Sequence, residues 1–157
     1  NKTMDLVVQD QENVLYLFST TGKLFWKKQL DGPIIGSITQ VDLYRNKRLQ
    51  MVFRTKNRFQ ILDRNGKVVP PFDLKLSGNA PQHLAVFDYD LNRNYRFLLA
   101  DGKQLQMYNS QGKKVNGFKL KKLKSPLANT PKHIRFGGKD YIVLQFNGGN
   151  IRLLNRQ

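Results

Sequence analysis

Apolar and polar residues alternate along this chain in short runs separated by small polar turns. One such run occurs four times, starting at Leu15, Phe59, Leu105 and Ile151. The first three copies lead into a turn that ends in Gly-Lys, with the glycine at positions 22, 66 and 112. Alternation with a period of two predicts β-strands, because successive side chains of a strand lie on opposite faces.

The four copies recur at intervals of 44, 46 and 46 residues. A repeat of this length, built from short strands, is typical of the blades of a β-propeller. We therefore predict an all-β chain of about three and a half four-stranded antiparallel blades. The blades are expected at residues 1–30, 31–76, 77–122 and 123–157.

The alternation and the turn residues place the individual strands. The first blade is expected to hold strands at 6–9, 14–18 and 23–29. The second is expected to hold strands at 33–41, 49–54, 58–62 and 67–74. The third is expected to hold strands at 83–87, 95–100, 104–108 and 114–120, and the fourth strands at 132–136, 141–146 and 150–154.

The two ends of this repeat array are incomplete. Closed propellers have about four to eight blades, so three and a half blades predict a fragment of a larger propeller. The alternative is that copies of the chain associate through exposed edges. We favour the fragment, because open strand edges invite aggregation.

Composition adds one exclusion and one possible partner. The 157 residues include no cysteine, which excludes disulfides and thiolate metal sites. They carry 27 Lys and Arg against 11 Asp and Glu, a formal net charge of +16. Such a charge attracts polyanions, although a solvated basic face that keeps a β-rich protein soluble is the favoured interpretation. The densest basic run gives the polyanion candidates Lys113, Lys114, Lys119, Lys121, Lys122 and Lys124.

The segment from Asn13 to Trp26, with Thr21-Gly22-Lys23 at its turn, resembles the repeats of quinoprotein-like (PQQ-like) propellers. In that family the tryptophan packs between neighbouring blades. Here it is present once, while Pro70 and Asn116 stand at the matching places. Quinoprotein dehydrogenases hold their quinone with acidic and amide ligands, calcium and often a vicinal cysteine pair. The sequence has no such cluster, so we expect no cofactor.

The same resemblance extends to relatives of that propeller class that carry no cofactor. These include outer-membrane assembly scaffolds, which act by binding proteins. The resemblance therefore implies an extracytoplasmic location, in the periplasm or at the cell surface.

The segment from Phe87 to Ala100 resembles the FG-GAP or integrin-type blade hairpin, whose loop of alternating acidic residues chelates calcium. Three alternating oxygen ligands suit a hard cation, and the weak calcium candidates are Asp88, Asp90 and Asn92. Arg93 replaces the turn glycine of that motif, and Arg96 replaces its distal acidic ligand. These changes favour the alternative that the aspartates cap the hairpin turn through its backbone amides.

His83 and His133 occupy equivalent positions in successive repeats, near one end of the expected ring. No carboxylate recurs at a fixed offset from them, so hydrogen bonding to an inter-blade loop is favoured over a metal or acid–base role. The sequence has no nucleophile elbow, and its paired glycines precede no helix that could bind a phosphate. We predict no catalytic residue and no enzyme activity.

These features predict a non-catalytic scaffold or protein-interaction module whose partner is a protein. The alternative function is a basic platform for a polyanion, either nucleic acid or an acidic glycan. No apolar run approaches the roughly 20 residues of a membrane span, so no transmembrane segment is expected. The remaining blades are expected from the same longer chain or from a self-associating copy.

Overall fold

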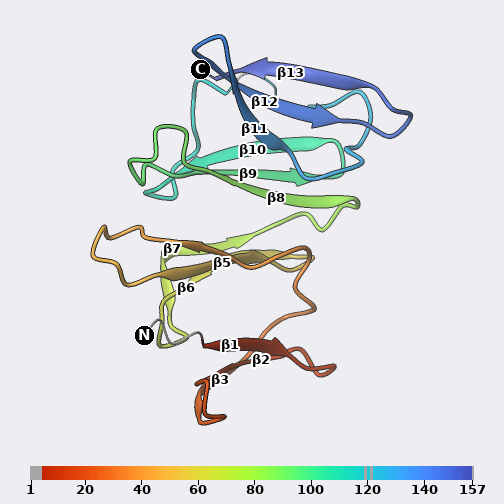
Figure 1. Ribbon diagram of the computed structural model, residues 1–157. Helices are drawn as coiled ribbons and strands as arrows, with labels where there is room; N and C mark the ends of the chain where they lie inside the picture. The colour runs from red at the N-terminus through yellow and green to blue at the C-terminus, as the bar shows by residue number, and fades with distance from the viewer. Residues whose placement is uncertain (1–4, 119, 121, 157) are drawn as a thin grey trace.

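A computed structural model describes residues 5–118, 120 and 122–156 (Figure 1). Within these residues the protein is all-β, with thirteen strands in four antiparallel sheets. Each sheet is built from consecutive strands, and the sheets follow one another from the N-terminal to the C-terminal end (Figure 1). This arrangement confirms the predicted all-β fold of successive antiparallel blades.

Each sheet is a meander of neighbouring strands. The first sheet consists of β1 (Leu6–Gln9), β2 (Val14–Phe18) and β3 (Leu24–Gln29). The second consists of β4 (Thr39–Val41), β5 (Gln50–Arg54), β6 (Arg58–Leu62) and β7 (Val68–Lys75). The third consists of β8 (Gln82–Phe87), β9 (Arg96–Asp101) and β10 (Gln104–Asn109). The fourth consists of β11 (Lys132–Phe136), β12 (Lys139–Gln145) and β13 (Ile151–Asn155).

The described residues of 114–120 form no regular fourth strand in the third sheet, although the sequence predicts one there. The described residues of this stretch form a turn at Asn116 and Gly117, and Lys119 lies outside them. Isolated bridges at Lys114 and Lys122 attach the stretch to β10. Asparagine and glycine favour turns, and the apolar residues on either side do not keep a strand's period of two. The prediction of a regular strand here is therefore wrong.

The predicted strand at 33–41 is shorter in the structure, where only β4 forms. Pro33 has no N–H to donate to a ladder, and Gly36 adopts a positive φ of 79°. These two residues end the extended pairing before residue 39.

The Gly-Lys turn has the same geometry in three sheets. It begins at Ser19, Asp63 and Asn109, whose side chains accept hydrogen bonds from the backbone N–H groups two and four positions later. The donor–acceptor distances lie between 2.8 and 3.2 Å. A short side-chain acceptor at the first turn position therefore fixes each copy, which explains why the turn is recognisable in the sequence.

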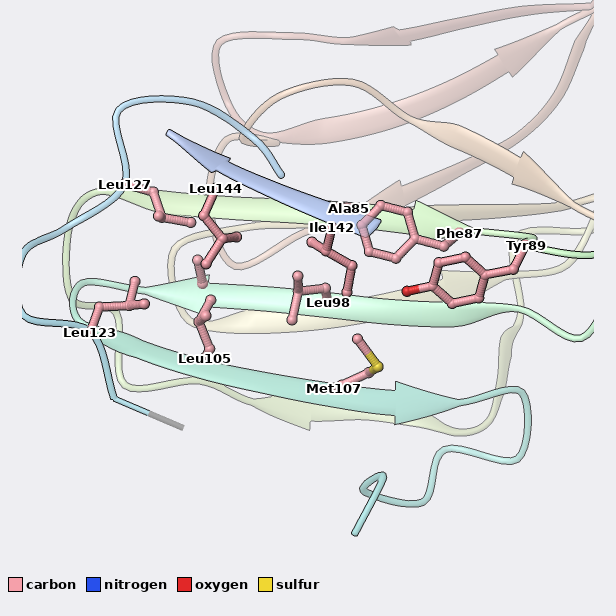
Figure 2. Close-up of a cluster of buried hydrophobic side chains, with 11 residues drawn as sticks. Ala85, Phe87, Tyr89, Leu98, Leu105, Met107, Leu123, Leu127, Ile142 and Leu144 are labelled. Carbon is pink, nitrogen blue, oxygen red and sulfur yellow. The ribbon is translucent and has the colours of Figure 1, made fainter. Parts of the chain in front are cut away.

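Three layers of apolar side chains fill the spaces between neighbouring sheets. The layer between the first and second sheets contains Leu15, Leu30, Met51, Phe53 and Leu62. The layer between the second and third contains Val41, Val52, Phe59, Ile61, Val69, Phe72, Phe97, Leu99 and Tyr108. The layer between the third and fourth contains Ala85, Phe87, Tyr89, Leu98, Ala100, Leu105, Met107, Leu123, Leu127, Ile142 and Leu144 (Figure 2).

In two places a side-chain ring from one sheet packs against the Gly-Lys turn of the next sheet. Trp26 donates its Nε1–H to the backbone oxygen of Arg64 at 2.8 Å and lies against Gly66. Pro71 lies in the same way against Gly112. The sequence aligns Pro70 with Trp26, but a register irregularity between β6 and β7 moves the contact one residue on.

A buried ion pair joins the second and third sheets. Arg54 is fully buried and donates to Asp101 Oδ1 at 3.1 Å and to the backbone oxygen of Ala100 at 2.9 Å. The Asp101 carboxylate also accepts hydrogen bonds from the Ser77 hydroxyl and from the Gly78 N–H. Burial lowers the pKa of Arg54, and the hydrogen bond to Asp101 opposes that shift. Each charged group is thus satisfied inside the core.

The two outermost faces of the stack carry exposed apolar side chains. On the first sheet these are Leu6, Val8, Leu24 and Phe25, and on the fourth sheet Ile134, Phe136, Ile151 and Leu153. No described residue covers them. The inner sheets bury apolar side chains on both faces. The exposed apolar side chains of the two outer faces are typical of a surface that packs against another sheet.

Candidate functional site

The loop between β8 and β9 contains the weak calcium candidates. The carboxylate of Asp88 accepts hydrogen bonds from the backbone N–H groups of Asn92 and Arg93, at 3.1 and 3.0 Å. The Asn92 side chain accepts the N–H of Asn94 at 3.0 Å. These oxygens therefore cap the turn, as the alternative interpretation of the loop predicts. Within the described part of the chain, no group of three or more histidine, aspartate or glutamate side chains could hold a metal ion.

The loop before it has the same geometry although its sequence differs. Asp42 accepts the N–H groups of Asn46 and Lys47, at 3.0 and 3.1 Å. The two loops also touch, because Arg93 contacts the Asp42 carboxylate at 3.2 Å. The aspartate is thus the element that defines this loop, whether or not calcium could bind.

The third calcium candidate, Asp90, points away from its loop towards the end of the chain. Arg156 donates to both of its carboxylate oxygens, at 2.8 and 2.6 Å. Arg156 also donates to Asp140 at 3.0 Å, and Arg135 donates to both oxygens of Asp140 at 2.8 and 3.0 Å. His133 contacts Asp140 at 2.8 Å. We call these residues, together with Tyr89, the Arg156 network.

Tyr89 forms the inner wall of the Arg156 network. The Arg156 guanidinium lies 4.7 Å from the centroid of its ring, a distance at which a cation is attracted to the ring face. The His133 ring meets the same tyrosine edge-on at 4.8 Å. Burial raises the pKa of Tyr89 to about 12, so its hydroxyl stays protonated at neutral pH.

Electrostatics in the Arg156 network hold both carboxylates in the charged form. The hydrogen bond from Arg135 holds the pKa of Asp140 well below its usual range. Arg156 lowers the pKa of Asp90 in the same way. The two carboxylates raise the pKa of Arg156 in turn. At neutral pH the network is therefore an ionised bridge between the third and fourth sheets.

Next to this bridge, between the third and fourth sheets, lies the larger of two hollows, and the smaller is lined by residues of β10 and the stretch that follows it. The larger has a volume of about 570 Å³, and its lining includes Tyr89, Arg96, Met107, Phe118, Ile142 and Arg152. The smaller, of about 380 Å³, is lined by residues that include Leu105, Met107, Lys114, Phe118 and Lys122. Both lie along β10, beside the stretch where the predicted fourth strand does not form.

The polyanion candidates belong to the stretch that follows β10 in the sequence. Lys113, Lys114, Lys122 and Lys124 are all exposed. Lys119 and Lys121 lie outside the described residues. Of these four, Lys114 and Lys122 line the smaller hollow.

The two histidines differ although their sequence positions are equivalent. His83 contacts the backbone oxygen of Leu127 at 3.2 Å and Thr130 Oγ1 at 3.4 Å, both in the loop before β11. This agrees with the predicted bond to an inter-blade loop. His133 instead contacts Asp140 on the neighbouring strand of its own sheet.

Sequence reasoning missed the Arg156 network. A signal was present, because a two-residue Gly137-Gly138 turn fixes the register of the strands around it. In that register Arg135 stands directly opposite Asp140. The ion pair between Asp90 and Arg156 joins segments 66 residues apart, and no local sequence pattern predicts it.

Comparison with known proteins supplies the fold and little more. No family model matches the sequence, and no curated protein matches it. Among solved structures, the chain is similar to one in the crystal structure of BBS1N in complex with ARL6DN, soaked with lead. The TM-score is 0.59 at 15% sequence identity, over 94% of this chain and 48% of the other.

The fold is that of a β-propeller. The chain spans about half the length of the BBS1 propeller chain that it matches. Among the described residues, none of which forms a helix, there is no apolar helix long enough to cross a membrane.

Proposed function

We propose that this chain is a non-catalytic part of a β-propeller, whose third and fourth sheets contact a protein partner. The observation that carries this proposal is the structural similarity to the BBS1 propeller, which was solved in complex with another protein, ARL6DN. Propellers of one fold serve many functions, so the partner itself must be sought on the surface of this chain.

The geometry of the Arg156 network supports binding over catalysis. Asp90 and Asp140 are both engaged by arginines, and their pKa values are lowered. A general acid or base works best with a pKa near the working pH. These carboxylates are therefore suited to holding the two sheets together, beside hollows that remain open to a ligand.

The exposed apolar faces support a larger ring. In a propeller each blade packs against two neighbours, and here the first and fourth sheets have only one. We propose that further blades of the same longer chain cover Leu6 and Val8 at one end and Phe136 and Ile151 at the other. The extracytoplasmic location and the kinship with PQQ-like repeats remain predictions.

A polyanion platform is the second candidate. It is favoured by the exposure of Lys113, Lys114, Lys122 and Lys124 in the stretch after β10 and by the formal charge of +16. Such binding depends on counterion release and weakens steeply with salt. Protein binding through an apolar and hydrogen-bonded surface depends on salt far less.

The two candidates are separated by capturing partners of the native protein in its source cells, after in-cell cross-linking. The affinity of a purified partner is then measured by calorimetry at several salt concentrations. We expect a protein whose affinity changes by less than about tenfold between about 50 and 200 mM salt. A nuclease-sensitive partner whose affinity falls by about a thousandfold over that range would overturn the proposal in favour of the polyanion.

A further inference from the structure

The two hollows beside β10 are neighbours, and we call them together the depression. Both are lined by Met107 and Phe118, so these two side chains stand between a hollow of about 570 Å³ and one of about 380 Å³. Volumes of this size are typical of binding pockets. A ligand that used both would need two bulky apolar groups joined by a short linker.

Positive charge lies at both ends of this depression. Arg96 and Arg152 line the larger hollow, and Lys114 and Lys122 line the smaller one. Among the described residues, none of the four side chains forms an ion pair with a carboxylate. The acidic groups nearby, Asp90 and Asp140, are already held by Arg135 and Arg156. The uncompensated charges therefore favour an anionic ligand.

We propose that this depression binds an acidic peptide segment in which carboxylate side chains alternate with large apolar ones. The apolar side chains fill the two hollows on either side of Met107. The carboxylates then meet Arg96 and Arg152 at one end and Lys114 and Lys122 at the other. The proposal rests on the proposed function, because the peptide would belong to the protein partner.

A nucleic acid fits the depression less well than such a peptide. Single-stranded nucleic acid binds by stacking bases on exposed aromatic faces. The ring of Tyr89 is covered by the Arg156 guanidinium on one side and met by the His133 ring. The other aromatic ring in the lining, Phe118, is partly buried against the apolar layer. The lining also includes the apolar side chains of Met107, Ile142 and Leu154, which suit leucine or phenylalanine.

Gly117 offers a way to fill the larger hollow. A Cβ atom there meets no heavy atom within 4 Å, and its φ is not positive. A Gly117→Trp substitution therefore places an indole at the lining of the hollow without clashing with the backbone. Thr20 is likewise an exposed turn residue, in the first sheet and away from both hollows, so Thr20→Trp is the matched control.

Charge is tested by a second pair of substitutions. Arg152→Glu reverses one charge at the hollow, whereas Arg48→Glu makes the same change on an exposed arginine of the second sheet. The probe is a short labelled peptide of alternating glutamate and phenylalanine, followed by fluorescence anisotropy. Comparison probes are a glutamate–serine peptide, a lysine–phenylalanine peptide, decanoate and a single-stranded oligonucleotide.

We expect the glutamate–phenylalanine peptide to bind the unmodified chain and both control variants with equal affinity. Gly117→Trp and Arg152→Glu should each weaken it by about tenfold or more, as expected for losing a buried anchor or a charged contact. The comparison probes should bind at least tenfold more weakly.

Three results would overturn the proposal. They are no binding of the glutamate–phenylalanine peptide, an equal loss in the test and control variants, and equally tight binding of any comparison probe. If the Gly117→Trp variant does not fold, the peptide affinity of the Arg152→Glu variant still tests the proposal.

The proposed protein-binding function is tested separately from this peptide site. If a protein partner is captured and binds both test variants normally, the module stands and this depression is not its site.

Discussion

The interface between the second and third sheets is closed, whereas the interface between the third and fourth is partly open. At the closed interface Phe59, Phe72, Phe97 and Tyr108 form ring pairs with centroids 5.4 to 6.4 Å apart. At the open interface an ion-pair network and two hollows lie beside the apolar layer. The same repeat builds both interfaces, and one element of it differs between them.

That element is the fourth strand. In the second sheet β7 forms and delivers Phe72 into the apolar layer. In the third sheet the equivalent stretch turns at Asn116 and Gly117, and Phe118 stays only partly buried. A propeller can therefore keep its stacked sheets and still open a binding hollow, by leaving one outer strand unformed.

The largest effect is expected from a substitution that removes the buried ion pair of the closed interface. Arg54→Met should lower the free energy of unfolding by about 3–5 kcal/mol, because it leaves Asp101 charged and unpaired in the core. Arg58→Met is the matched control in the same sheet, since Arg58 pairs with Asp73 at a half-exposed position. Its cost should stay within about 1 kcal/mol. Urea unfolding measures both, and equal losses would contradict the assignment of Arg54 as the buried join.

A second prediction compares apolar side chains of the two interfaces. Phe97→Ala removes a fully buried ring from the closed interface and should cost about 3–5 kcal/mol. Met107→Ala should cost about 2 kcal/mol, at the lower end for such a truncation, because Met107 already borders both hollows. Thermal and urea unfolding of the two variants measure the difference. If Met107→Ala were the costlier change, the open interface would be better packed than its hollows indicate.

Much of the closed architecture could be predicted from the sequence, and most of the open site could not. Ser19, Asp63 and Asn109 each predict a turn, because their side chains accept hydrogen bonds from backbone N–H groups within the same turn. Asn116 and Gly117 favour the turn that replaces the strand after Gly112, but the hollow beside that turn depends on how Val115 and Phe118 pack against the apolar layer, which is a long-range property. Pairing between Asp90 and Arg156 likewise depends on two loops meeting across the stack.

The repeated turns give a smaller effect, with a control at the equivalent position. Gly112→Ala would bring a Cβ to 2.5 Å from Pro71, and Gly66→Ala would bring one to 2.8 Å from the Trp26 ring. Gly22 has the same kind of positive φ but nothing within 4 Å. Gly22→Ala should therefore cost only the strain of its backbone, about 1 kcal/mol. The other two should cost about 1–3 kcal/mol more, as measured by chemical unfolding, and three equal values would show that the rings can move aside.

The smallest effect concerns the open interface and its dependence on pH. The folded-state pKa values of Asp90 and Asp140 are lowered by arginines, so their contribution to stability is present above the unfolded pKa of about 4. It should be lost as the pH falls through the lower folded values. At pH 7 the Asp140→Asn variant should therefore have a lower melting temperature than the unmodified chain. This difference in melting temperature should shrink as the solution is acidified below about pH 4.

Added salt is the control for this last prediction. Salt screens the ion pairs, so it should also reduce the difference in melting temperature at neutral pH. A gap in melting temperature that is constant in both pH and salt would mean that Asp140 acts through packing alone. The ionised bridge would then not be what holds the open interface together. In that case the larger hollow would owe its shape to the packing of Phe118 and Ile142, which line it, and the charge test at Arg152, which lies outside the Arg156 network, would be unaffected.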